Sequence, residues 1–204
     1  MLGGEAAPVF YNYIKFDGAV SVMTNYMLPD NAVIVAVIAT TNGNRSFVGV
    51  SDGTYITGIH GGYSSGANKM YWKYNGAGGN RNTGSKNAAQ ALFLTPTRGG
   101  NLSETRTTFT ASSNKPNAPL RFGWFDNSIS ICNGSIGVVQ IFGADAKDET
   151  SGNAIRNNHT PIAVFRPCTY KGQAGFWHEE EGIFYGKIST NTGTMIATDT
   201  LITV

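Results

Sequence analysis

The residues best suited to chemistry lie together between Lys69 and Gly76, where aromatic and basic side chains are densest. If this segment is a β-strand, alternate side chains point to opposite faces, so two aromatic rings share one face. Two aligned rings predict a platform for the apolar face of a sugar, with neighbouring asparagine amides to bind its hydroxyl groups. The alternative is that these rings fill the core of a β-sandwich. The candidate glycan-binding residues are Tyr71, Trp72, Lys73, Tyr74 and Asn75.

Catalytic patterns are missing from the sequence. The segment His178-Glu-Glu-Glu-Gly182 begins like the zinc-protease motif H-E-x-x-H, but Gly182 stands where the second histidine belongs. His60 and His159 are expected at the surface or at caps, and the acidic residues after His178 are expected in a solvated turn. No G-x-S-x-G elbow or P-loop occurs, and no Asp or Glu lies between Gly53 and Ser103. We therefore predict no catalytic residues and no cofactor.

The sequence gives little support for a metal site or for a disulfide. Asp145 and Asp148 share a loop but lack the D-x-D-x-D-G pattern of a calcium site, so we predict solvated acids and no metal ligand. Cys132 and Cys168 are far apart and outside any C-x-x-C spacing. Free cysteines are commonly buried. We expect two buried thiols, with a bridge as the alternative.

Composition narrows the range of partners. The chain has 204 residues, of which 14% are charged and 26 are glycine, and its net charge is +2. This field is too weak to hold a nucleic-acid backbone, so nucleic acid is not an expected partner. The longest apolar run, at 32–39, is too short to span a bilayer as a helix, so no membrane association is expected. The N-terminal residues lack the basic cluster and the apolar run that are typical of an export signal.

The periodicity of the chain predicts strands almost throughout. Alternating or β-branched segments are separated by Gly, Asn, Asp and Pro, which is typical of an antiparallel β-sandwich. We expect a single domain over residues 1–204, with the apolar run at 32–39 as a central strand and a type I′ hairpin at Asp52-Gly53. Long loops are expected at 76–86 and 144–158. The expected strands are 9–16, 20–23, 32–39, 46–50, 55–60, 69–74, 88–94, 105–110, 120–125, 136–143, 162–166 and short pieces near Phe176, Phe184 and Met195.

The C-terminal part carries a resemblance to a known family. Its motifs are Phe165-Arg-Pro-Cys168, Gly172-Gln-Ala-Gly-Phe-Trp177 and Phe184-Tyr-Gly186, followed by Gly193-Thr194. This series resembles the closing segment of concanavalin A-like jelly-roll domains of the laminin-G type, found in gut bacteriophages and in surface proteins of Bacteroidetes. Segments 13–18, 45–50 and 137–142 are similar to earlier strands of that family. The resemblance implies a jelly-roll fold and a mainly adhesive or structural role.

These observations predict a non-enzymatic structural or adhesion protein of a bacteriophage particle, as a head decoration, fibre or tail-associated protein. Its expected partners are other virion proteins or further copies of itself, with a host-surface glycan as an additional candidate. Its expected location is the virion, after synthesis in the host cytoplasm, with an extracellular or cell-surface location as the alternative. The alternative functions are a free-standing bacterial carbohydrate-binding lectin and, less favoured, a glycoside hydrolase or lyase.

Overall fold

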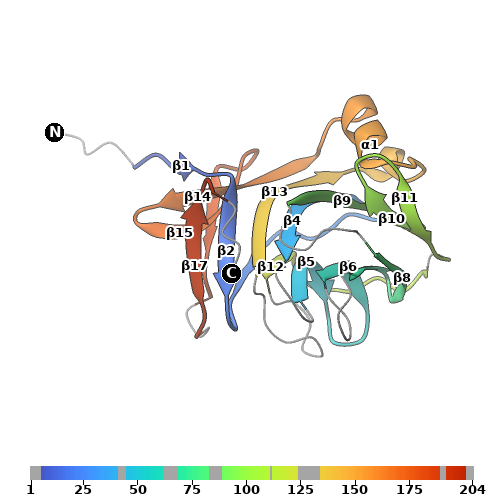
Figure 1. Cartoon of the computed structure of the whole chain (residues 1–204), viewed down its shortest axis with the longest axis horizontal. Helices are drawn as coiled ribbons and strands as arrows, with labels where there is room; N and C mark the ends of the chain where they lie inside the picture. The colour runs from blue at the N-terminus through green and yellow to red at the C-terminus, as the bar shows by residue number, and fades with distance from the viewer. Residues whose placement is uncertain are drawn as a thin grey trace.

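Two antiparallel β-sheets face each other across a hydrophobic core (Figure 1). This computed structural model describes residues 6–40, 45–61, 69–82, 89–110, 112–123, 134–188 and 192–200. Every strand pair in these ranges is antiparallel. The predicted all-β antiparallel sandwich is therefore confirmed.

Within the described ranges, the large sheet has eleven strands and the small sheet six. The strands of the large sheet are β1 (Val9–Phe10), β2 (Tyr13–Asp17), β4 (Val33–Thr40), β9 (Gln90–Leu94), β10 (Arg98–Asn101), β11 (Thr105–Thr108), β13 (Gly134–Phe142), β14 (Ala163–Tyr170), β15 (Gln173–His178), β16 (Ile183–Gly186) and β17 (Thr194–Thr198). The strands of the small sheet are β3 (Ser21–Met23), β5 (Arg45–Ser51), β6 (Ile56–Gly61), β7 (Lys69–Tyr74), β8 (Ala77–Asn82) and β12 (Arg121–Gly123). Two short helices, η1 (Ala144–Ala146) and α1 (Gly152–Asn158), lie between β13 and β14.

The large sheet divides at β13. Strands β11, β10, β9 and β4 lead to β13 in that order, and beyond it β2 pairs with the first part of β13 while β14 pairs with the second. The small sheet runs β3-β12-β5-β6-β7-β8. An isolated bridge between Val22 and Lys187, with the amide of Ile188 donating to the Ser21 carbonyl at 3.1 Å, ties the small sheet to the segment that follows β16.

Strand β4 is central, as the apolar run predicted. It lies between β9 and β13, and its inward side chains join the main core. Its outward residues Val33 and Val35 form a second buried cluster with Phe93, Phe142 and Ile155. Figure 1 shows α1 above this end of the sheet, which explains why both faces of β4 are apolar.

Aromatic rings dominate the main core. Phe122 lies 4.3 Å from Phe176 and 5.3 Å from Phe165 between ring centroids, and Phe16 stacks on Phe176 at 6.3 Å. These rings come from both sheets, so their contacts hold the two layers together. Aromatic pairs of this kind add about 1 kcal/mol each beyond the burial of their area.

Four segments differ from the prediction. The strand expected at 9–16 is divided by a bend at Asn12 into β1 and β2. The expected loop at 76–86 begins with strand β8, the expected loop at 144–158 contains η1 and α1, and β10 was not predicted. The hairpin at Asp52-Gly53 is confirmed, but its turn is not type I′, because Gly53 has a positive φ and Asp52 does not. Instead the Asp52 carboxylate accepts the amides of Thr54 and Tyr55 at 2.9 and 2.8 Å.

Two other turns do have the type I′ signature of positive φ at both central residues. They are Asn75-Gly76, between β7 and β8, and Lys171-Gly172, between β14 and β15. Each closes a two-residue hairpin, as the register of the flanking strands shows. No helix in the described ranges is long and apolar enough to cross a membrane.

Candidate functional site

The predicted aromatic strand is β7, and the side chains on its two faces differ in burial. Trp72 is fully buried and Tyr74 is 5% exposed, whereas Tyr71 and Lys73 lie half-exposed on the outer face. The prediction of an exposed platform formed by Trp72 and Tyr74 is therefore wrong. The inner face of β7 packs against the large sheet, so these rings fill the core, as the alternative interpretation had it.

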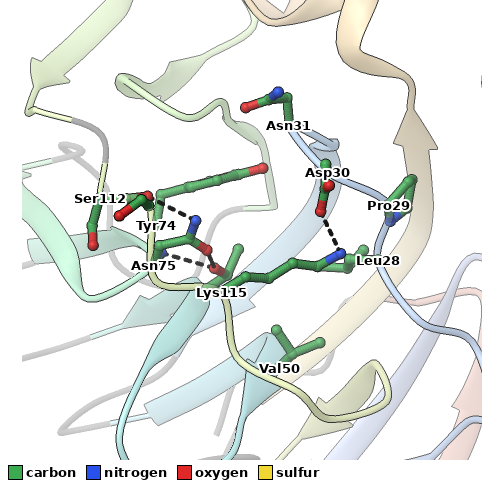
Figure 2. Close-up of a pocket in the computed structure, with 11 residues that line it drawn as sticks. Leu28, Pro29, Asp30, Asn31, Val50, Tyr74, Asn75, Ser112 and Lys115 are labelled. Atoms are coloured by element: carbon green, nitrogen blue, oxygen red, sulfur yellow. Dashed lines mark hydrogen bonds and ion pairs between the residues drawn. The ribbon is translucent and has the colours of Figure 1, made fainter.

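The end of β7 nevertheless reaches a pocket of about 220 Å³ (Figure 2). Tyr74 and Asn75 line it, so two of the five predicted residues belong to a hollow in the surface. The other lining residues come from the segment before β4, from β5 and β6, and from the connection between β11 and β12. They are Leu28, Pro29, Asp30, Asn31, Val50, Thr57, Ser112, Ser113 and Lys115.

Asn75 is held in one orientation. Its backbone amide donates to Thr57 Oγ1 at 2.9 Å, and the Thr57 hydroxyl donates to Asn75 Oδ1 at 3.0 Å. Its Nδ2 donates to the Ser112 carbonyl at 2.9 Å (Figure 2). An amide side chain has two donor hydrogens and two acceptor lone pairs. These contacts use one of each, which leaves one fixed donor and one fixed acceptor for a ligand.

Tyr74 contributes its ring, and not its hydroxyl, to the binding surface of the pocket. The phenol donates to the Ala32 carbonyl at 3.0 Å, which connects the small sheet to the residue before β4. Burial, and secondarily the Asp30 carboxylate, raises the pKa of Tyr74 far above its ordinary value of 10.0. The hydroxyl therefore stays protonated and committed to this bond.

The rim of the pocket carries one ion pair. Lys115 Nζ lies 2.8 Å from Asp30 Oδ1, and both side chains are exposed (Figure 2). The hydrogen bond and charge of Lys115 lower the pKa of Asp30 below its ordinary value of 3.8. The two charges compensate each other, so the pocket presents polar groups without a net charge.

The segment 112–120, here called the strap, lines one side of the pocket through Ser112, Ser113 and Lys115. Besides the contacts of Ser112 and Lys115, the amide of Asn117 donates to Asp52 Oδ2 at 3.1 Å. At its far end the amide of Leu120 donates to the Tyr26 carbonyl at 2.8 Å. Backbone amides of Tyr55, Thr54 and Asn117 lower the pKa of Asp52, in that order of importance. The strap is thus fixed at several points, and the pocket beside it is preformed.

The described residues of the pocket lining include both polar and apolar groups. Asp30 is the one carboxylate among the pocket residues, and glycoside hydrolysis by the usual route needs two. No histidine or cysteine is found among the lining residues that the structure describes. What it does offer is an oriented amide, hydroxyl groups, a compensated ion pair and the apolar surfaces of Leu28, Val50 and the Tyr74 ring.

The three histidines lie away from this pocket. His159 caps the end of α1, as predicted for a capping residue; its Nδ1 lies 2.8 Å from Asp145 Oδ2 and its Nε2 3.0 Å from Glu149 Oε1. Hydrogen bonds to Asp145 first and Glu149 second raise the pKa of His159 above 6.5. His60, expected at the surface, is 2% exposed.

His178 is buried as well, although the acidic turn after it is exposed as predicted. Its ring stacks on Phe165 with centroids 4.5 Å apart, and the carboxylates of Glu180 and Glu181 lie 3.4 and 3.1 Å from its nitrogens without aligned hydrogen bonds. In the described ranges, no three His, Cys, Asp or Glu side chains are grouped to hold a metal ion.

Several predicted features lie outside the described residues or differ from expectation. Cys168 is a buried free thiol, as predicted, while Cys132 lies outside the described residues. Trp177 is partly buried and packs on Tyr170. Asp145 faces His159, and Asp148 pairs with Lys147.

Sequence reasoning missed Asp30, Thr57, Ser112 and Lys115, which long-range packing brings to Asn75. One local signal was present: Asn75-Gly76 is the commonest type I′ dipeptide, and it places the Asn75 side chain at the end of a hairpin. Comparisons of the chain with family models, curated proteins and solved structures find no match.

Proposed function

We propose that this protein is a non-enzymatic glycan-binding module of a bacteriophage particle, and that the pocket at Asn75 holds one sugar ring of a host-surface glycan. The observation that carries the proposal is the fixed Asn75 amide, which keeps one donor and one acceptor at the end of a preformed pocket. Sugar hydroxyl groups both donate and accept, so this pattern is complementary to them.

The size of the pocket supports a small ligand. Pockets for drug-sized molecules hold about 300–1,000 Å³. At about 220 Å³ this one is smaller, and a single sugar ring is of the appropriate size. The apolar surfaces of Leu28, Val50 and Tyr74 would contact the ring's carbon-bound hydrogens, while Asn75 and the rim would bind its hydroxyls.

Placement on a phage particle is supported by the resemblance of the C-terminal motifs to jelly-roll domains of gut bacteriophages. The weakly charged, glycine-rich composition suits contacts with neighbouring proteins and neutral glycans. A free-standing bacterial lectin would use the same pocket and would differ only in location.

A glycan-array screen followed by calorimetry tests the binding. Asn75→Gly keeps the backbone conformation of the type I′ turn and removes the side-chain amide together with its bonds to Thr57 and the Ser112 carbonyl. We expect it to weaken glycan binding about tenfold. Lys171→Gly is the matched control, because Lys171 has the same turn position and a φ of 49° like Asn75, outside the pocket. Absence of any glycan binding, or equal binding by wild type and Asn75→Gly, would refute the proposal that this pocket binds a glycan.

Mass spectrometry of purified particles tests the location. We expect this chain among the virion proteins. If it is absent from particles but still binds glycan through Asn75, the virion assignment fails and the lectin remains.

A further inference from the structure

The large sheet forks next to β13, and the registers of β13 with its neighbouring strands skip two residues at the fork. Ile136 pairs with Ile14 of β2, and Val139 pairs with Phe165 of β14. Toward β4 the register also shifts between Ile136 and Val139. Gly137 and Val138 therefore form a β-bulge at the point where β2 and β14 diverge. Bulges are over-represented at sheet edges and next to active sites.

A groove of about 470 Å³ lies at this fork, on the outer face of the large sheet. Its apolar lining comes from β4, β13 and β14, and consists of Val37, Val138, Val164 and Pro167. It shares no residue with the pocket at Asn75. Its volume lies within the range for small-molecule sites and is about twice that of the pocket.

Two tyrosines from the N-terminal segment also line the groove. Tyr11 and Tyr13 lie on either side of a bend at Asn12, between the end of β1 and the start of β2, and both line the groove. The backbone between them is fixed, because the amide of Tyr11 donates to the Pro167 carbonyl at 3.0 Å and the amide of Asn12 donates to Asp199 Oδ1 at 3.0 Å. The backbone that carries both tyrosines is thus fixed at the groove before any ligand binds.

The polar groups of the groove are oriented and carry no net charge. Arg156 Nε donates to Gln140 Oε1 at 2.9 Å, so the carbonyl end of this amide faces Arg156 and its NH₂ group is directed elsewhere. Arg166 pairs with Glu179 at 3.0 Å, which compensates both charges. The groove therefore combines tyrosine rings, an apolar surface and a fixed amide donor.

We propose that this groove is a second ligand site, which takes a short neutral oligosaccharide spanning about two sugar rings. Sugars present apolar faces to tyrosine rings and hydroxyls to amides, which matches this lining. A charged polymer is disfavoured because the one ion pair is internally satisfied. An added peptide strand is disfavoured because the register of β13 is interrupted over only two residues, Gly137 and Val138.

The test is calorimetry and saturation-transfer NMR with neutral gluco-, xylo- and manno-oligosaccharides, with oligogalacturonate and a proline-rich peptide library as comparison probes. Tyr11→Ala removes a ring and leaves the backbone bond to Pro167 in place. Gln140→Glu keeps the partner of Arg156 and removes the NH₂ donor. We expect each variant to weaken binding of the neutral oligosaccharide about tenfold. Tyr170→Ala, a half-buried tyrosine outside the groove, is the control and should leave binding unchanged.

The outcomes separate the groove from the pocket. Binding that survives Asn75→Gly but is lost in Tyr11→Ala and Gln140→Glu supports the groove. Failure of all neutral oligosaccharides to bind there, binding unaffected by both groove variants, or binding of only the acidic or peptide probes overturns it. If Asn75→Gly abolishes all glycan binding while Tyr11→Ala and Gln140→Glu bind as the wild type does, the groove proposal fails and the pocket proposal stands.

Discussion

Trp72 lies directly against Gly99 of the opposite sheet: a Cβ atom at residue 99 would come within 2.1 Å of Trp72 Cγ. The largest fully buried side chain of β7 thus fits only because β10 has no side chain at this point. The contact sets the local spacing of the two sheets. It also explains why the indole is unavailable to a ligand.

We expect Gly99→Ala to lower the free energy of unfolding by about 2 kcal/mol, because the added methyl overpacks a filled core. Denaturant unfolding measures the change. In a Trp72→Phe background the smaller ring leaves room for the added methyl group. Gly99→Ala should then lower the free energy of unfolding clearly less. Equal costs in both backgrounds would contradict the packing explanation.

Tyr74→Phe should lower the free energy of unfolding by about 1 kcal/mol, since it removes the hydrogen bond to the buried Ala32 carbonyl. The ring remains in the pocket, so glycan affinity should stay within a factor of about two. Unfolding and calorimetry on the same variant check both expectations. A large loss of affinity with unchanged stability would mean that the hydroxyl contacts the ligand.

The pair of carboxylates around His159 predicts a pH-dependent contribution to stability. The pKa of His159 is raised above its unfolded value of 6.5, so this contribution is complete below pH 6.5 and is lost as pH rises through the folded pKa. The pKa values of Asp145 and Glu149 are lowered from 3.8 and 4.5, so their contribution is lost as pH falls through those lowered values.

His159→Gln should therefore destabilise the protein more at about pH 6 than at about pH 9. Unfolding curves at both pH values measure the difference. Asp148→Asn is the control, because that neighbouring carboxylate pairs with Lys147 instead. A destabilisation by His159→Gln that does not change with pH would contradict the imidazolium pairing.

Burial raises the pKa of the Cys168 thiol to about 11, which keeps it protonated and shielded near neutral pH. In a Cys132→Ser background, which leaves Cys168 as the one thiol, we expect very slow reaction with a thiol reagent in the native state and rapid reaction in denaturant. Rapid native labelling would show that β14 opens readily.

The sequence predicted strands best where their side chains are either all apolar or strictly alternating between the two faces. The apolar run at 32–39 correctly predicted a central strand, and the alternation at 69–74 correctly bounded β7. Alternation could not say which face of β7 meets the core, because both faces carry aromatic rings. Only the opposing Gly99, distant in sequence, decides that question.

Other elements escaped prediction because of their glycines and polar residues. Strand β8 begins Ala-Gly-Gly-Asn and β10 is Arg-Gly-Gly-Asn, compositions typical of loops, and pairing with β7 and β9 makes them strands. Helix α1 is short and polar, and it forms around the Ser151 cap and the buried Ile155. The pocket depends on the strap meeting β7 and the segment before β4, which no local pattern encodes.

The Lys171-Gly172 turn has a practical use. It reverses the chain in two exposed residues, and a Cβ atom at Gly172 would touch nothing within 4 Å. It contributes to neither the pocket nor the groove. A fluorophore or a surface tether attached at Lys171 would therefore project into solvent. Such a handle would allow the protein to be immobilised with both candidate binding sites accessible.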